Sequence, residues 1–224
     1  MLSEMTLFGQ AILVLAALVL FLSFAMLGET RLPNMIKMFA WQGALLALTT
    51  VLVAMDSGHG HLYLSAALTL ALKAALIPWM LHRLMLRLNV PRQEEPLGHP
   101  TIVLLAGAAL VLFSYSVSAP VVQLSFHVAR NTLAISMAVV LVGMLLMITR
   151  RTAMAQVVGF MSIENGLFFA AVAATYGMPL IIELGIAFDV LVAAVIFGVF
   201  FFRIRDSIDT LDVDRMNRLR ELDE

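Results

Sequence analysis

Residues 5–28 read MTLFGQAILVLAALVLFLSFAMLG, a run that contains no charged side chain. At a rise of about 1.5 Å per residue, a helix of this length crosses the hydrocarbon core of a bilayer, which is about 30 Å thick. Further apolar runs follow at 35–55, 62–86, 101–118, 129–149, 154–175 and 180–203. The sequence therefore predicts an all-α, polytopic membrane protein of about seven transmembrane helices.

Composition supports the bilayer as the solvent of this chain. Hydrophobic residues make up 62% of the sequence and charged residues 13%, whereas soluble chains have about 45–50% and about 25%. No basic run suggests a nucleic-acid partner. The absence of Cys excludes Cys-ligated zinc and protein-ligated iron–sulfur clusters. Because no nucleophile–base pair, phosphate loop or haem motif is present, we expect no catalytic residue, metal site or cofactor in this chain.

The basic residues predict how the helices are oriented. With the N-terminus outside and the C-terminus inside, Arg130 alone lies in an outer connector and Lys73 lies within a span. Such a bias is the positive-inside pattern of cytoplasmic loops. The other 12 of the 14 basic residues then face the cytoplasm: Arg31, Lys37, Arg83, Arg87, Arg92, Arg150, Arg151, Arg203, Arg205, Arg215, Arg218 and Arg220.

The runs divide the chain into four parts. We expect a three-helix transmembrane unit at 1–100, a linking transmembrane helix at 101–128, a second three-helix unit at 129–204 and a charged cytoplasmic tail at 205–224. The two three-helix units share one order, in which an apolar helix and an Arg at the cytoplasmic turn precede two helices with polar residues near mid-depth. The sequence alone leaves open whether this reflects internal duplication or only a shared apolar composition.

Three ionisable residues fall deep within predicted spans. Lys73, Glu164 and Asp189 lie about 17, 15 and 14 Å into their helices at 1.5 Å per residue. Each costs about 2.5–3.5 kcal/mol at mid-bilayer if it is unpaired. They must therefore face one another, the protein interior or water.

Three more polar residues accompany this group. Glu183 is shallower, about 5 Å into its helix, whereas Gln42 and Asn165 add uncharged hydrogen-bonding groups near the level of the three charges. One interpretation is a proton or ion relay, because a buried carboxyl group can exchange its proton near neutral pH. The other is a packing device, in which Lys73 holds helices together through a salt bridge. Depth does not decide whether Lys73 contacts Glu164 or Asp189.

The last three spans resemble known membrane subunits. Arg150-Arg151 followed by Val158-Gly159-Phe160-Met161-Ser162-Ile163-Glu164-Asn165-Gly166-Leu167 is similar to a helix of the K subunit of respiratory complex I and of the C subunit of multisubunit cation antiporters. Three strings are more similar to component E of hydrogenase-4: Met161-Ser162-Ile163-Glu164-Asn165-Gly166, Glu183-Leu184-Gly185-Ile186-Ala187-Phe188-Asp189 and Thr210-Leu211-Asp212-Val213-Asp214. The first resemblance covers about 129–203 and the second nearly the whole chain.

The resemblance implies a function. It implies a non-catalytic membrane-arm subunit of a group 4 hydrogenase-like complex in the prokaryotic inner membrane. Its partners would be antiporter-like and quinone-module-like chains and a peripheral hydrogenase module. The two intramembrane glutamates of the K subunit correspond to Glu164 and Asp189, the second being one methylene shorter here. The relay would then consist of Glu164, Asp189, Lys73 and Glu183.

Two alternatives stand beside this prediction. One is a subunit of a non-redox cation/proton antiporter or of an ion-coupled inorganic-carbon uptake complex. The other is a structural membrane scaffold whose buried charges serve packing alone. The sequence leaves open whether H⁺ or Na⁺ moves, and in which direction.

Overall fold

The computed structural model describes residues 7–58, 60–87, 99–118, 127–175, 185–196 and 198, with the backbone alone described for 127–131 and 173–175. The helices are α1 (Leu7–Gly28), α2 (Leu32–Ser57), α3 (His61–Thr69), η1 (Leu70–Leu76), α4 (Ile77–Arg87), α5 (Pro100–Ser118), α6 (His127–Thr149) and α7 (Ala153–Thr175). A shorter apolar helix covers Gly185–Ile196. The all-α prediction is confirmed.

Six of these helices are long and apolar enough to cross a membrane, when α3, η1 and α4 are taken as the single helix His61–Arg87. Their bounds differ by only a few residues from the predicted runs. The seventh predicted run, 180–203, is represented by Gly185–Ile196, and its other residues, apart from Gly198, lie outside the described part of the chain. Glu183 and the tail at 205–224 lie outside it as well.

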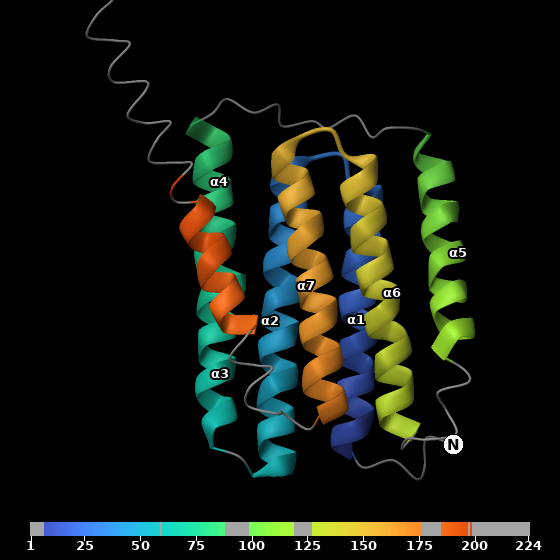
Figure 1. The fold of residues 1–224 in the computed structure, drawn as a ribbon, viewed down its shortest axis with the longest axis vertical. Helices are drawn as coiled ribbons and strands as arrows, with labels where there is room; N and C mark the ends of the chain where they lie inside the picture. Colours follow the sequence, from blue (N-terminus) through green and yellow to red (C-terminus); the bar gives the residue numbers. More distant parts are fainter. Residues whose placement is uncertain are drawn as a thin grey trace, which may run out of the picture.

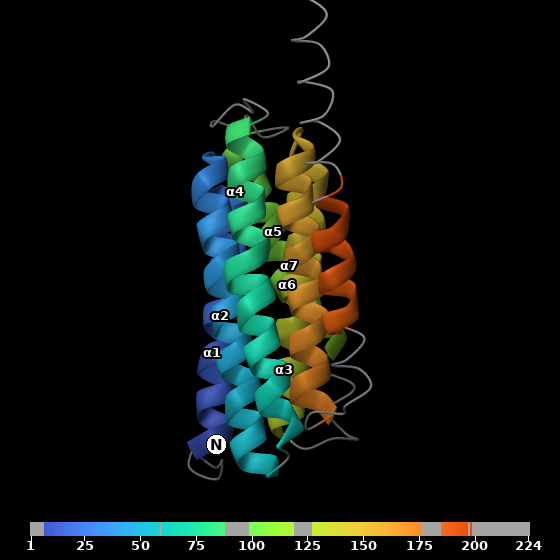
Figure 2. The same cartoon turned by 90° about the vertical axis from the view of Figure 1, so that its left-hand side faces the viewer.

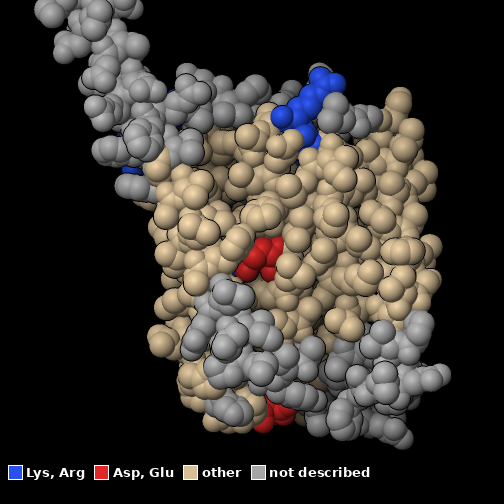
Figure 3. Space-filling view, in the orientation of Figure 1, with Lys and Arg blue, Asp and Glu red and all other residues tan. Residues whose placement is uncertain are grey.

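The helices form a bundle in which successive members run in opposite directions (Figures 1 and 2). α1 and α2 form one layer and α6 and α7 the other, with the α3–η1–α4 helix at one edge and α5 at the opposite edge. The α1–α2 and α6–α7 connections lie at the same end of the bundle, where α4 also ends. Basic side chains show at this end in Figure 3. This arrangement fits the predicted grouping of Arg31, Arg87, Arg150 and Arg151, while the orientation relative to the membrane stays a prediction.

Local sequence explains how α2 begins and ends. Pro33 occupies its first turn, where a missing backbone N–H costs no helical hydrogen bond. At the other end Gly58 has a φ of 70°, in the left-handed region, and its N–H donates to the Ala54 carbonyl at 3.0 Å. Glycine adopts this conformation without steric cost, and it closes the helix.

The third span contains a π-helical segment that the sequence analysis did not predict. η1 interrupts the α-helix between α3 and α4, and Lys73 lies within it. Pro78 follows at the start of α4 and has no N–H to donate to the carbonyl four residues before it. A wider turn directly before the proline accommodates this loss. π turns of this kind are frequent at functional sites.

Candidate functional site

The three deep charged residues meet in the interior of the bundle. The Lys73 ammonium forms a salt bridge with Glu164 Oε2, and its Nζ lies 3.5 Å from Asp189 Oδ1. The side chains of Lys73 and Asp189 are fully buried, and that of Glu164 is 11% exposed. The contacts join η1, α7 and the Gly185–Ile196 helix. Lys73 therefore approaches both carboxylates, which answers the question that the sequence left open.

An amide chain continues from the other side of Lys73. Lys73 Nζ donates to Asn165 Oδ1 at 3.0 Å, and Asn165 Nδ2 donates to Gln42 Oε1 at 3.4 Å. Gln42 Nε2 then donates to Ser23 Oγ at 2.7 Å and to the Val19 carbonyl at 3.2 Å. These side chains are almost wholly buried. The polar cluster thus reaches from the Gly185–Ile196 helix through α7 and α2 to α1. Asn165 bonds directly to the ammonium group, and Gln42 bonds to Asn165.

Gly43 allows η1 to lie directly against α2. A Cβ atom added at Gly43 would be 2.8 Å from Lys73 Cβ and 2.9 Å from the Lys73 carbonyl carbon. Any side chain here would displace the backbone that positions the ammonium group. Gly43 and Ser23 were not among the residues predicted from the sequence. A serine and a small residue within otherwise apolar runs were the available signals, but hydropathy does not tell which side of a helix they occupy.

The charges within the cluster do not balance. Glu164 and Asp189 provide two carboxylates against the single Lys73 ammonium, which also lies 4.9 Å from the centre of the Phe168 ring. In the described part of the chain, neither carboxylate oxygen of Asp189 has a hydrogen-bond donor. A proton on one of the two carboxyl groups resolves the imbalance of charge, and a bound water would supply the missing hydrogen-bond donor. The arrangement is chemically suited to holding and exchanging a proton.

Arg150 has a role at the end of the bundle that the sequence analysis did not predict. This buried side chain is only 1% exposed, and its Nη2 donates to the carbonyls of Met26, Leu27 and Glu29 at 3.3, 2.9 and 2.6 Å. Carbonyls at a helix C-terminus lack helical partners and attract positive charge. Arg150 therefore caps α1 and fixes its end to the α6–α7 connection.

Comparisons with known proteins identify sequences that are related to this chain. It is 35% identical over 191 residues to the uncharacterized protein Rv0085 of Mycobacterium tuberculosis, an alignment that covers 85% of this chain and 87% of that protein. The chain belongs to the family of this mycobacterial protein. No family model matches it, and no solved structure does.

A second relationship is more distant. The chain is 27% identical over 134 residues to hydrogenase-4 component E of Escherichia coli strain K12, and the same values hold for the Shigella flexneri protein. The alignment covers 59% of this chain and 62% of the hydrogenase component, less than two thirds of its length. A distant similarity to component E is thereby confirmed over 59% of the chain, and the relatives are bacterial. Its extension over nearly the whole chain stays a prediction. The likeness to the K subunit of complex I stays a prediction.

Proposed function

We propose that this protein is a non-catalytic membrane-arm subunit of a group 4 hydrogenase-like, complex I-related assembly in the cytoplasmic membrane of a prokaryote. The observation that supports this most directly is the buried cluster of Lys73, Glu164 and Asp189 inside a bundle with six candidate spans. Intramembrane charges that pair with one another are typical of ion and proton pathways. The distant similarity to hydrogenase-4 component E supports a hydrogenase-like assembly.

Lys73 acts in this proposal as a movable cation between two proton acceptors. Its Nζ is bonded to Glu164 and lies 3.5 Å from Asp189 Oδ1. A small movement of the flexible side chain brings it to the about 2.7–2.9 Å of a charge-assisted hydrogen bond with Asp189. When a proton neutralises Glu164, the ammonium group moves toward Asp189, and the reverse step returns it. The proton position and the Lys73 position are thereby coupled.

The amide chain positions this cation without taking part in proton exchange. Asn165 accepts from Lys73 Nζ at 3.0 Å and is itself held by Gln42. Because Asn and Gln do not titrate, they keep one bond to the ammonium in both charge states. The fully buried hydroxyls of Thr69 and Ser162, which have no hydrogen-bond partner among the described residues, offer places at which water could extend the relay.

The redox chemistry belongs to other chains in this proposal. With no Cys in the sequence, the chain has no thiolate ligand for a nickel–iron centre or an iron–sulfur cluster. The partners would be antiporter-like and quinone-module-like membrane chains and a peripheral hydrogenase module. Glu183 would extend the relay toward the outer face, and it lies outside the described residues.

Charge-neutral substitutions test the relay. Glu164→Gln and Asp189→Asn keep size and hydrogen bonding but remove titration, so we expect the complex to assemble, with hydrogenase turnover partly retained and proton translocation sharply reduced. The measurement is proton uptake per hydrogen turnover in inverted membrane vesicles. Asp56→Asn is the matched control, because this exposed carboxylate lies at the far end of α2. Full translocation in an assembled Glu164→Gln, Asp189→Asn double variant would end the relay proposal.

The scaffold alternative has one observation in its favour, because the same cluster also ties η1, α7 and the Gly185–Ile196 helix together. It predicts that translocation falls only as far as the amount of assembled complex falls. The identity of the co-purifying chains distinguishes the antiporter alternative from the present proposal. If antiporter subunits co-purify without a hydrogenase module, the antiporter alternative is correct.

A further inference from the structure

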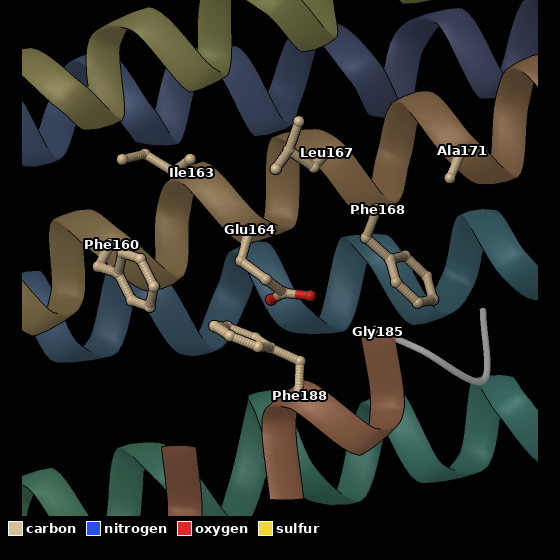
Figure 4. Close-up of a pocket in the computed structure, with 8 residues that line it drawn as sticks. All are labelled: Phe160, Ile163, Glu164, Leu167, Phe168, Ala171, Gly185 and Phe188. Atoms are coloured by element: carbon tan, nitrogen blue, oxygen red, sulfur yellow. The ribbon is translucent and has the colours of Figure 1, made fainter. Parts of the chain in front are cut away.

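A groove between α7 and the Gly185–Ile196 helix opens on the side of the bundle at the level of the charged cluster. Its volume is about 280 Å³, and apart from Glu164 its lining is apolar: Phe160, Ile163, Leu167, Phe168, Ala171, Gly185 and Phe188. Figure 4 shows the Glu164 carboxylate pointing from α7 toward the neighbouring helix, between the Phe168 and Phe188 side chains. In the space-filling view, acidic atoms are visible in a hollow midway between the two ends of the bundle (Figure 3).

Glu164 is the member of the cluster that reaches this groove. Its side chain is 11% exposed, whereas Lys73 and Asp189 are fully buried. Lys73 supplies one positive charge for two carboxylates, so the cluster retains one negative charge when both are ionised. A carboxylate that faces hydrocarbon at mid-bilayer is costly without a counter-charge. Glu164 is paired with Lys73, so the excess negative charge belongs to the cluster as a whole, and Glu164 is the carboxylate through which the groove reaches it.

The size and lining of the groove select the kind of occupant. A volume of about 280 Å³ lies just below the range of about 300–1,000 Å³ for small-molecule and cofactor sites. It suits one long side chain better than a whole ligand. Phe160 and Phe188 lie side by side with ring centroids 5.6 Å apart, and aromatic faces attract cations. The rim is apolar, with Leu167 58% exposed and Phe160 39% exposed.

We propose that this groove receives a basic side chain (Lys, Arg or protonated His) from a transmembrane helix of a neighbouring subunit, which pairs with Glu164. Apolar side chains of that helix would pack against Leu167 and Phe160. The inference rests on the proposed membership of a multisubunit assembly. A second cation beside Glu164 would repel the Lys73 ammonium toward Asp189. Docking of the partner would thereby set the position of Lys73 within the relay.

Site-directed cross-linking in the native complex tests the occupant. Leu167→Cys places a thiol-anchored photoreactive probe at the rim of the groove in host membranes. Phe113→Cys is the matched control, because Phe113 on α5 is 54% exposed and lies at a similar distance from the same end of the bundle. We expect position 167, and not 113, to yield a peptide from a partner's membrane helix with a basic residue within two turns of the cross-link.

Two further variants distinguish a loss of partner binding at the groove from a loss of the folded chain. Leu167→Trp fills the groove without removing a charge, and Glu164→Gln removes the charge without filling it. Leu167→Trp should lower the yield of the cross-linked partner at least tenfold relative to this chain during mild purification. Glu164→Gln leaves the groove open and the complex assembled, so it should lower that yield by a smaller factor. In both variants the chain should stay in the membrane. The matched Phe113→Trp variant should leave that yield unchanged.

The outcomes distinguish this inference from the proposed function. Cross-links from position 167 to lipid alone, to a second copy of this chain, or to a partner helix without a basic residue would overturn the groove assignment while an intact complex keeps the proposed function. If no partner co-purifies with the unaltered chain, both proposals fail.

Discussion

α5 and α7 both pack against α6, yet only α7 takes part in the candidate site. Over their 18-residue apolar stretches, 56% of α7 is buried but only 22% of α5. Gly159 of α7 lies against α6 so closely that an added Cβ would be 2.8 Å from Met147 Cγ. α5 reaches α6 through a hydrogen bond from Ser114 Oγ to the Ala134 carbonyl at 2.6 Å.

Two kinds of contact hold a charge-bearing helix in place within a bilayer. Lipid tails are as apolar as leucine, so burial of apolar surface does not drive helices together there. Close backbone approach at small residues and interhelical hydrogen bonds do so instead. α7 has both, through Gly159 and Asn165, and its carboxylate at Glu164 is positioned accordingly. α5 also has an interhelical hydrogen bond, from Ser114, but its side chains are mainly exposed, so it should tolerate change.

Replacing Lys73 by Met should have the largest effect on stability. The substitution keeps most of the apolar part of the side chain but leaves Glu164 and Asp189 without their shared cation. Removing one partner of a buried ion pair costs about 3–5 kcal/mol. SDS titration in lipid–detergent micelles would report the free energy of unfolding. Adding Glu164→Gln to Lys73→Met should recover part of the loss, and an unchanged stability of the single variant would contradict the ion-pair assignment.

Arg150→Met should come next, because Arg150 joins the α6–α7 connection to α1. The charged donor bonds to the carbonyls of Leu27 and Glu29, and hydrogen bonds to charged groups contribute about 1.5–3 kcal/mol. We expect a loss of that size in the same titration. Arg151→Met is the control, since Arg151 is exposed at the same connection. Equal losses in the two variants would show that the cap contributes nothing specific.

Gly159→Leu tests the close approach of α6 and α7. An added Cβ would lie 3.1 Å from the Met147 nitrogen and 3.2 Å from the Gly143 carbonyl oxygen, backbone atoms that cannot rotate away. Overpacking of this kind costs about 1–3 kcal/mol. Ala109→Leu on the exposed side of α5 adds a similar volume and should be neutral. If both variants were equally stable, the packing difference between the two helices would not govern stability.

The sequence predicted where the helices lie much better than which residues meet. Apolar runs set the span lengths, so 62–86 became His61–Arg87 with little change. Counting residues along each helix placed Lys73, Glu164 and Asp189 at similar depths, and the cost of a charge that faces lipid predicted that they face inward. Their contact depends on rotation about each helix axis, on the π turn around Lys73 and on the space left by Gly43. Hydropathy contains no information on these three features. The cap that Arg150 forms on α1 was not predicted either, because a basic residue in a connector is normally solvated.

Phe113→Leu on α5 should have the smallest effect on stability. Phe113 is 54% exposed on a helix of which little is buried, and exposed substitutions usually change stability by no more than about 0.5 kcal/mol. Leu is as compatible with lipid as Phe, so neither the free energy of unfolding nor proton translocation should move. On α7, the companion substitution Phe168→Leu removes the ring that lies 4.9 Å from Lys73 Nζ, and it should be measurably destabilising in the same titration. A loss at Phe113 as large as that at Phe168 would show that the face of α5 is covered by protein, and α5 would then belong to an interface with another subunit.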